Sequence, residues 1–431
     1  QSTQSAYQMA RQQYGATRSQ PIKSEIAVDD FSKVSPTQYY EPIAPKLLSP
    51  NDSLELIGKV KRYSGLFDSL PDVIDGQANI SVLQERRYFL SSEGTRVVQN
   101  QNAIYLIIRS SIRAVDGDVV PLNFLIYARK LSELPTDEEI GNKIRAMIEK
   151  LAKLKTAPLA EPYTGPAILQ ARAAAVFFHE IFGHRVEGHR LRIKTDGQTF
   201  KDKINERVLP PGIDIIFDPT RRDFNNVPLH GHYLYDDEGV QAHGVKVVEN
   251  GFLKRFLMSR TPIEAFNQSN GHGRAQAGVN VVTRQSNMIV TNHKPVPTSQ
   301  LRKMLLQECT RQRKPYGYLF VDVEGGFTNT QRFVPNAFNI FPTEVYRVYV
   351  DGRPDELVRG VDLIGTPLAM FAEIKATDDK PEVFTGFCGA ESGSVPVTAV
   401  SPSLLVNRIE TQRKMTMQVE RPLVQKPGKN Q

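Results

Sequence analysis

The periodicity of apolar and polar positions changes along the chain and divides it into regions. Residues 1–50 are rich in Gln, Ser and Pro and carry few apolar side chains, which predicts an extended arm. Residues 51–160 predict an α/β domain. Its apolar runs predict strands, which we place at residues 80–82, 87–90, 97–109 and 119–129. An amphipathic run with an acidic first turn after Thr136 predicts a helix that ends near Lys155.

The second half of the chain alternates short apolar runs with turns that contain glycine. A polar stretch with prolines at residues 157–163 predicts a domain boundary, and the Ala-rich residues 168–190 predict a strong helix. A further helix is expected at residues 298–311. The remaining apolar runs predict strands at residues 213–217, 245–248, 287–290, 318–323, 344–350 and 396–400.

The fold class that follows is α+β. We expect an N-terminal antiparallel sheet with packing helices in residues 51–160, and a larger β-rich C-terminal domain in residues 161–410 that contains the Ala-rich helix. Residues 411–431 form a basic tail in this scheme.

Composition narrows the class of protein. The 431 residues are 40% hydrophobic and 23% charged, which is ordinary globular usage and fits two or three domains of about 150 residues. The apolar run at residues 173–178 is six residues long. A membrane-spanning helix needs about 20 apolar residues, so we expect no membrane span.

The net charge and the first residue of the chain bear on the protein's binding partners and on its location in the cell. The net charge is +7, and the last 25 residues hold six Lys or Arg and two Glu. A nucleic-acid-binding protein more often carries its charge on a folded face, so we expect no nucleic-acid partner. The first residue is Gln1 rather than Met and lies in a polar arm, which favours export to the periplasm or outside the cell, with a cytoplasmic location as the alternative.

The motif His179-Glu180-Ile181-Phe182-Gly183-His184 carries the most specific chemistry. In zinc peptidases with H-E-x-x-H, the two histidines are about 40° apart on one helix face, and the glutamate acts as base on the metal-bound water. Here the histidines are five positions apart, which is about 140° on a regular helix. Both can face one metal only if the helix opens between them, and Gly183 is the residue where this costs least.

A third ligand is needed if this motif holds catalytic zinc. Cys388 is the candidate because it lies between Gly386 and Gly389, and a thiolate binds zinc well. The alternative for each cysteine is a small buried hydrophobic residue, which we expect for Cys309. A disulfide between the two cysteines would require an oxidising compartment. The alternative for the histidine motif is a solvated helix face, but three His and two Glu in eleven residues are costly to bury without a metal.

Two further polar clusters add candidates. Residues 230–239 include His232 and Tyr233, either of which would assist at a substrate carbonyl, and residues 270–274 include His272 and Arg274. Each cluster is also compatible with an ordinary surface loop.

Taken together, these motifs resemble the TldD/PmbA metallopeptidase family, historically called modulators of DNA gyrase. The resemblance covers roughly residues 165–409 and extends weakly to residues 88–94. The segments that carry it are 179–187, 236–239, 270–274, 361–365, 386–389 and 394–397, in the order in which the family has them.

The resemblance implies a zinc-dependent peptidase of the catalytic type that hydrolyses small or unfolded peptides. It assigns the zinc to His179, His184 and Cys388, and the base that activates the metal-bound water to Glu180. It also implies a dimer, of two copies or with a related subunit. We expect support of the ligands or substrate contacts from Glu187, His189, His232, Tyr233, His272 and Arg274. The competing function is a non-catalytic peptide-binding or regulatory module with a structural or absent metal.

Overall fold

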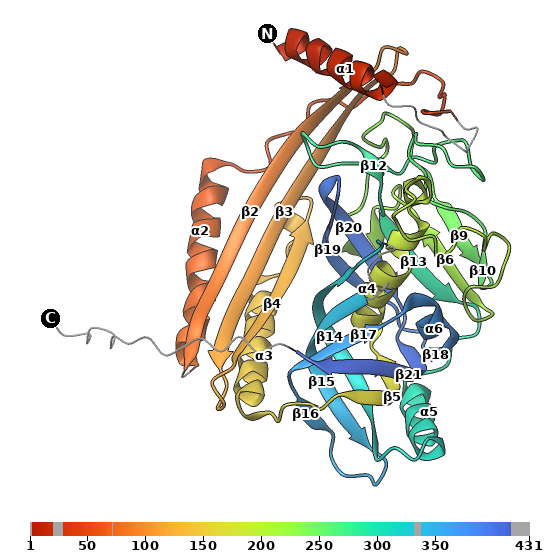
Figure 1. Ribbon diagram of the computed structural model, residues 1–431. Coiled ribbons are helices and arrows are strands. Elements are labelled where there is room, and N and C mark those ends of the chain that lie inside the picture. The colour runs from red at the N-terminus through yellow and green to blue at the C-terminus, as the bar shows by residue number, and fades with distance from the viewer. Residues whose placement is uncertain (1, 20–28, 71, 332–337, 415–431) are drawn as a thin grey trace.

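A long sheet, antiparallel except for its short first strand, stands beside a larger β-rich body in the computed structural model, which describes residues 2–19, 29–70, 72–331 and 338–414 (Figure 1). The strands of this N-terminal sheet are β1 (Gln38–Tyr40), β2 (Val73–Leu90), β3 (Arg96–Arg113) and β4 (Val119–Ala128). β2 and β3 pair along almost their whole length as an antiparallel hairpin. The two short strands predicted at residues 80–82 and 87–90 are therefore parts of one strand, because β3 pairs with the polar positions between them.

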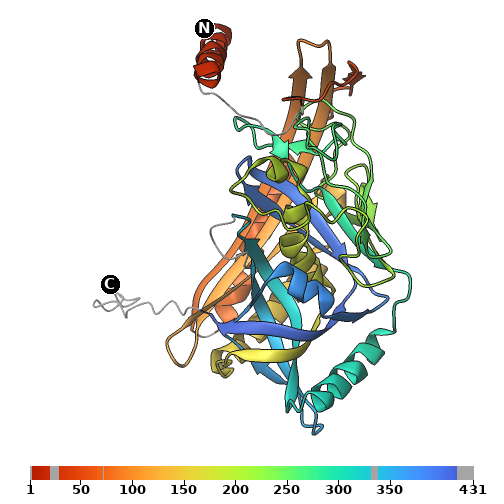
Figure 2. The ribbon, with the colours of Figure 1, turned by 45° about the vertical axis from the view of Figure 1, so that its right-hand side comes forward.

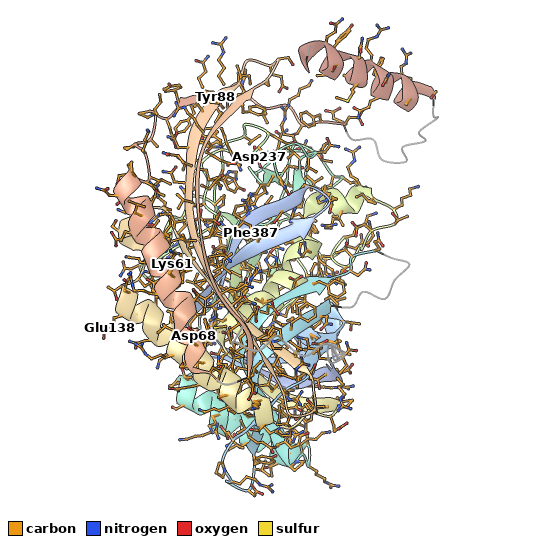
Figure 3. All side chains as sticks on the ribbon, turned by 90° about the vertical axis from the view of Figure 1, so that its left-hand side faces the viewer. Lys61, Asp68, Tyr88, Glu138, Asp237 and Phe387 are labelled. Carbon is orange, nitrogen blue, oxygen red and sulfur yellow. The ribbon has the colours of Figure 1, made fainter. Side chains whose placement is uncertain are left out.

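One face of the N-terminal sheet is covered by helices. α2 (Pro50–Gly65) and α3 (Asp137–Thr156) pack their apolar residues against this face, and the short 3₁₀ helices η1 (Leu66–Ser69) and η2 (Leu131–Glu133) connect them to the strands. Thr136 caps α3 through a capping box with Glu139, which confirms the helix start predicted there. Figure 3 shows Lys61 on α2 and Glu138 on α3, both on the outer side of the sheet.

Residues 1–50 are not simply an extended arm. α1 (Ser2–Ser19) is helical, so the expectation of an extended segment is wrong there. Ala, Gln, Arg and Met are good helix formers, and low hydrophobicity alone does not prevent a helix. β1 pairs with the start of β3, which ties the end of this region to the sheet.

The first part of the C-terminal body is a closed barrel. The order β14-β5-β21-β17-β15 returns to β14, so these five strands form a ring without open edges, and β16 and β18 add to it at the side. The strands are β5 (Tyr163–Leu169), β14 (Tyr316–Thr328), β15 (Phe338–Tyr349), β16 (Glu356–Val358), β17 (Val361–Gly365), β18 (Ile374–Thr377) and β21 (Leu404–Arg413).

The second part is a six-stranded sheet with the order β10-β9-β6-β13-β20-β19. Its strands are β6 (Ile213–Phe217), β9 (Val245–Glu249), β10 (Phe252–Leu253), β13 (Asn287–Asn292), β19 (Glu382–Ala390) and β20 (Gly393–Ser401). Two small hairpins complete the strands, β7 (Asp223–Phe224) with β8 (Val227–Pro228) and β11 (Gly273–Arg274) with β12 (Val282–Thr283).

Helix α4 (Ala171–Ile181) lies between the barrel and the six-stranded sheet and contacts β14 on one side and β19 and β20 on the other (Figures 1 and 2). The predicted helix 168–190 is too long at both ends. Ile168 belongs to β5, and after α4 the chain continues as the 3₁₀ helices η3 (Gly183–Val186) and η4 (Gly188–Arg192). The other helices are α5 (Thr298–Arg311) and α6 (Pro367–Ala372).

The predicted fold class is confirmed: the molecule is α+β, with a β-rich C-terminal part around one helix. Each of the strands predicted in this part overlaps an observed one, namely β6, β9, β13, β14, β15 or β20, but β14, β15 and β20 begin earlier than predicted, β15 by six residues. The predicted helix 298–311 is α5. β21 extends to Arg413, and residues 415–431 of the predicted basic tail lie outside the described residues. None of the described helices combines the length and hydropathy that a bilayer crossing requires.

Candidate metal centre

Helix α4 carries the first candidate ligand into the interior. The helix is buried between two sheets, and its small alanines let the neighbouring strands approach closely. His179 and Glu180 lie in its last turn and are only 8% and 7% exposed. Two polar side chains at this depth require partners.

The helix ends in the middle of the motif, as the spacing of the histidines predicts. α4 stops shortly after the first histidine, and the 3₁₀ helix η3 begins at Gly183. Side chains replace the lost helical donors: Gln285 Nε2 donates to the His179 carbonyl at 3.2 Å, and Arg185 Nη1 donates to the Glu180 carbonyl at 3.0 Å. A Cβ at Gly183 would lie 1.9 Å from Gln285 Oε1, so glycine leaves the space for this cap.

Three candidate donors converge at this point. His179 Nε2 lies 3.2 Å from Cys388 Sγ, and His184 Nε2 lies 3.4 Å from the same sulfur. The donor atoms of the three residues all lie within 4.8 Å of one another. Zinc at its usual bond lengths and tetrahedral angles separates sulfur and nitrogen donors by about 3.6 Å. Donor types and spacing therefore fit a zinc ion, and no fourth such residue joins this group among the described residues.

The local charges favour a thiolate at Cys388. Burial alone would raise the pKa of this thiol, but the imidazoles of His184 and His179 hold it well below its ordinary value. The thiolate is the form that binds metals. Burial raises the pKa of the Glu180 carboxyl, whose Oε2 lies 3.9 Å from His184 Nε2. The site thus places a carboxyl group directly beside the three donors.

Glu187 orients His184. Its Oε2 lies 3.2 Å from His184 Nδ1, and since a carboxylate only accepts, Nδ1 carries the proton and leaves Nε2 free to bind a metal. Glu187 is fully buried, and burial alone would raise the pKa of its carboxyl. The positive charges of His184 and Arg190 outweigh this effect and hold that pKa below its ordinary value. Arg190 Nε donates to Oε2 at 2.9 Å, and Arg284 Nε lies 3.6 Å from Oε1. This buried anion is therefore held by three basic groups.

Two buried groups hold the strand that carries Cys388. Arg284 donates to the Cys388 carbonyl at 2.5 Å and so links the β19–β20 hairpin to Glu187. Burial lowers the pKa of His230 to about 3, so its imidazole is neutral. Its Nδ1 donates to the Gly386 carbonyl at 3.0 Å, and its Nε2 accepts from the Tyr105 hydroxyl at 2.8 Å. Because Tyr105 belongs to β3, the N-terminal sheet takes part in positioning β19.

Two cavities meet at the candidate metal centre. One of about 280 Å³ lies over the three donor residues and is walled by β14 and the β19–β20 hairpin. The other, of about 250 Å³, lies between α4 and the N-terminal sheet. His179, Glu180, Gly326 and Phe387 line both. Figure 3 shows Phe387 in the middle of the molecule, and its ring lies 5.4 Å from that of Tyr105 on β3.

The backbone at Gly326 lies so close to the Glu180 side chain that a larger residue there would displace this carboxyl group. A Cβ at Gly326 would lie 2.8 Å from Glu180 Cγ and 2.9 Å from the Asn339 carbonyl oxygen. Gly326→Ala should therefore displace Glu180 and lower the kcat of any reaction in which Glu180 transfers a proton by about 10- to 100-fold, since a shift of about 1 Å at a reacting group has effects of this size. Steady-state kinetics beside a thermal melt would measure it.

Gly325→Ala is the matched control for this prediction. A Cβ at Gly325 meets no atom within 4 Å, so its rate should stay within about twofold of wild type. Equal rates for the two variants would show that the approach of Gly326 to Glu180 has no effect on activity.

Comparison with known proteins places the chain in a family. A family model described as the PmbA/TldA metallopeptidase C-terminal domain matches residues 162–413, which is more than half of the chain. The chain belongs to the PmbA/TldD metallopeptidase family. The matched region contains the barrel, the six-stranded sheet and all three candidate ligands.

Several metalloproteases are relatives within the PmbA/TldD family. The chain is 30% identical to a metalloprotease of Methanocaldococcus jannaschii, with 80% of this chain and 74% of that protein covered. It is 32% identical to a metalloprotease of Archaeoglobus fulgidus over 62% of this chain, and the match spans only 57% of that relative's length. A zinc metalloprotease TldD homolog of Saccharolobus solfataricus is 27% identical, with 75% of this chain and 68% of that protein covered.

A solved structure has the same fold. A Thermotoga maritima protein named as a modulator of a DNA gyrase matches with a TM-score of 0.64 at 18% identity, covering 91% of this chain and 81% of that one. The PmbA/TldD fold therefore includes the N-terminal sheet as well as the region matched by the family model.

The other site residues that we predicted in this PmbA/TldD chain lie farther from the three candidate donors than Glu180 and Glu187 do. His189 Nε2 lies 2.6 Å from Glu391, which lines the cavity over the donors. His232 donates to the Pro219 carbonyl, and neither it nor Tyr233 lines the cavities beside His179. The remaining two candidates, His272 and Arg274, do not line these cavities either.

Three of these outer residues have structural partners instead. The Tyr233 hydroxyl donates to the Gly271 carbonyl at 2.8 Å. His272 Nε2 lies 3.1 Å from the Ser286 hydroxyl. Arg274 donates to the Gln285 carbonyl at 2.6 Å and so supports the residue that caps α4.

Several residues at the site were missed by sequence analysis. They are Arg109, Arg172, Arg284, Gln285 and Gly326, and Arg185, His230 and Phe387 were not singled out within the segments that sequence analysis named. One signal was available: residues 284–287 form a polar run at the start of a predicted strand, and a surface turn is the usual interpretation of such a run. In the fold all four are at most 1% exposed.

Proposed function

We propose that this protein is a zinc-dependent peptidase that hydrolyses peptide bonds in small or unfolded peptides. The observation that carries the proposal is the convergence of His179, His184 and Cys388 at one point beside the Glu180 carboxyl, where two cavities meet. Three protein donors suit a catalytic zinc with an open position, whereas structural zinc sites close with four. The metalloprotease names of its relatives support the same reaction class, and one of them names zinc.

In the proposed reaction, the bound zinc, Glu180 and Glu187 would each have a separate role. Bound zinc would act as a Lewis acid on the peptide carbonyl and lower the pKa of the attacking water. Glu180 would accept the proton that this water loses as it attacks the carbonyl carbon. The protonated Glu180 would then donate that proton to the leaving amine, which restores the carboxylate. Glu187 would keep His184 in the required tautomer throughout.

The size of the cavities supports the substrate class. Volumes of about 250 and 280 Å³ accept a few side chains of an extended peptide but not a folded domain. We also propose that the protein acts as a dimer, of two copies or with a related subunit, as the family resemblance implies.

Removing the metal tests the proposed function. After dialysis against a chelator, hydrolysis of a mixed peptide pool should fall to background, because the remaining residues lack a Lewis acid. Adding back one equivalent of zinc should restore the rate. Metal analysis by mass spectrometry should give about one zinc per chain before chelation and none after it.

Two results would contradict this proposal. Hydrolysis that is unchanged after the chelated protein is shown to be metal-free would exclude a metallopeptidase. A zinc-loaded protein that binds peptides but releases no fragments from any pool would indicate the non-catalytic peptide-binding module instead.

A further inference from the structure

An arginine of the N-terminal sheet faces the candidate centre without a partner. Arg109 lies on β3, is exposed, and lines the 250 Å³ cavity together with His179 and Glu180. Alternate residues of β3 point to opposite faces. Ile108 packs beneath the covering helices, so Arg109 projects toward the C-terminal body. Within the described residues its guanidinium has no hydrogen bond or ion pair, although five N–H donors are available.

The other charged groups of this cavity are differently placed. Arg172 Nε donates to Asp322 at 3.0 Å and its Nη1 donates to the Val383 carbonyl, so its charge is balanced. The Glu324 carboxylate accepts a hydrogen bond from Asn123 Nδ2 at 2.7 Å and has no cationic partner among the described residues. Besides Glu180 at the candidate metal centre, the cavity therefore offers one free guanidinium, that of Arg109, and one carboxylate, that of Glu324, which already accepts a hydrogen bond from an amide.

We propose that Arg109 binds a carboxylate of the peptide substrate and makes the protein select peptides that carry one near the scissile bond. A guanidinium fork matches a carboxylate with two parallel hydrogen bonds, and its site is partly walled from water by β4 and β19. The inference rests on the proposed function and adds a substrate class to it. The same chemistry is offered by the C-terminal α-carboxylate of a peptide and by an Asp or Glu side chain.

The test uses one peptide in four forms. A hexapeptide with no other ionisable side chain is made with a C-terminal carboxylate or amide, and in each case with Asp or Asn at one position. The set of four is then repeated with that residue at each other position. Wild-type protein should cleave the preferred carboxylate form with a KM about tenfold lower than its uncharged counterpart, as a charge-assisted hydrogen bond allows. Loss of the preference on amidation identifies the α-carboxylate, and loss on the Asp to Asn change identifies the side chain.

Variants assign the preference to Arg109. Arg109→Ala should abolish the tenfold difference, whereas Arg96→Ala should keep it, because Arg96 is an exposed arginine of the same strand that lines neither cavity. Glu324→Gln should leave the preference intact or increase it, since it removes the competing negative charge. The difference should also shrink as salt is raised, because the Arg109 side chain is exposed.

A binding measurement separates failure of this inference from failure of the proposed function. Fluorescence anisotropy with labelled forms of the four peptides reports affinity whether or not they are cleaved. Tenfold tighter binding of the carboxylate forms that disappears in Arg109→Ala supports the inference even if no peptide is hydrolysed. Equal affinity of all four peptides for wild type, or a preference that survives in Arg109→Ala, overturns it.

Discussion

Replacing Glu180 with glutamine should reduce peptide hydrolysis by about 10²- to 10⁴-fold while the zinc content stays at the wild-type value. The amide has nearly the same shape but cannot accept the proton from the attacking water. Glu180 does not belong to the three-residue donor group, so the metal should remain. Turnover on a peptide pool and zinc per chain, measured on the same preparation, give both numbers.

A control variant shows whether the effect of Glu180→Gln is specific to that position. Glu138→Gln changes an exposed glutamate at the start of α3, on the outer side of the N-terminal sheet, and should leave turnover unchanged (Figure 3). If Glu180→Gln turns over peptide at the wild-type rate, Glu180 is not the base. If it loses zinc as well, its role is in holding the metal.

Replacing Cys388 with serine should cause a different failure, a protein that is folded but poor in metal. A neutral hydroxyl is a weak zinc ligand, whereas the imidazoles of His184 and His179 lower the pKa of the Cys388 thiol and so favour the thiolate that binds zinc. We expect zinc affinity to fall by at least 100-fold and activity to be lost with it. Competition with a chromogenic chelator measures the affinity, and excess zinc should restore activity only in part.

The other cysteine provides the matched control. Cys309 is also buried, on α5 in a separate apolar cluster, and burial raises the pKa of its thiol to about 11. Cys309→Ser should therefore keep wild-type zinc affinity, even if it lowers the melting temperature. A Cys388→Ser protein that holds zinc as tightly as Cys309→Ser would remove Cys388 from the ligand set.

The parts of the fold that local patterns determine could be predicted from the sequence. Thr136 and the acidic turn that follows it mark the start of α3, and short apolar runs mark six strands of the C-terminal part, namely β6, β9, β13, β14, β15 and β20. The opening of α4 at Gly183 also follows from local geometry, since a five-residue spacing cannot place two histidines on one helix face. The requirement that both histidines face one metal therefore predicts where the helix has to end.

Features created by packing between distant segments could not be predicted in this way. Arg284 and Gln285 are polar residues before a strand, which usually means a surface turn, yet the fold buries them beneath η3 and the β19–β20 hairpin. Gly326 is one of two adjacent glycines, and only its approach to Glu180 distinguishes it from Gly325. Arg109 lies in an alternating strand whose two faces both meet other elements, so periodicity alone does not show what it faces.

The distance along the chain between the donors has a consequence for biosynthesis. His179 and Cys388 are 209 positions apart, and Gln285, which holds the end of α4, lies between them. At about 5–20 residues per second, a ribosome produces the two histidines about 10–40 s before the cysteine. During that interval only a two-histidine half-site exists, and it lacks the thiolate. The three-donor site that we propose for zinc can therefore form only after residue 388 has been synthesised and β19 has paired with β20.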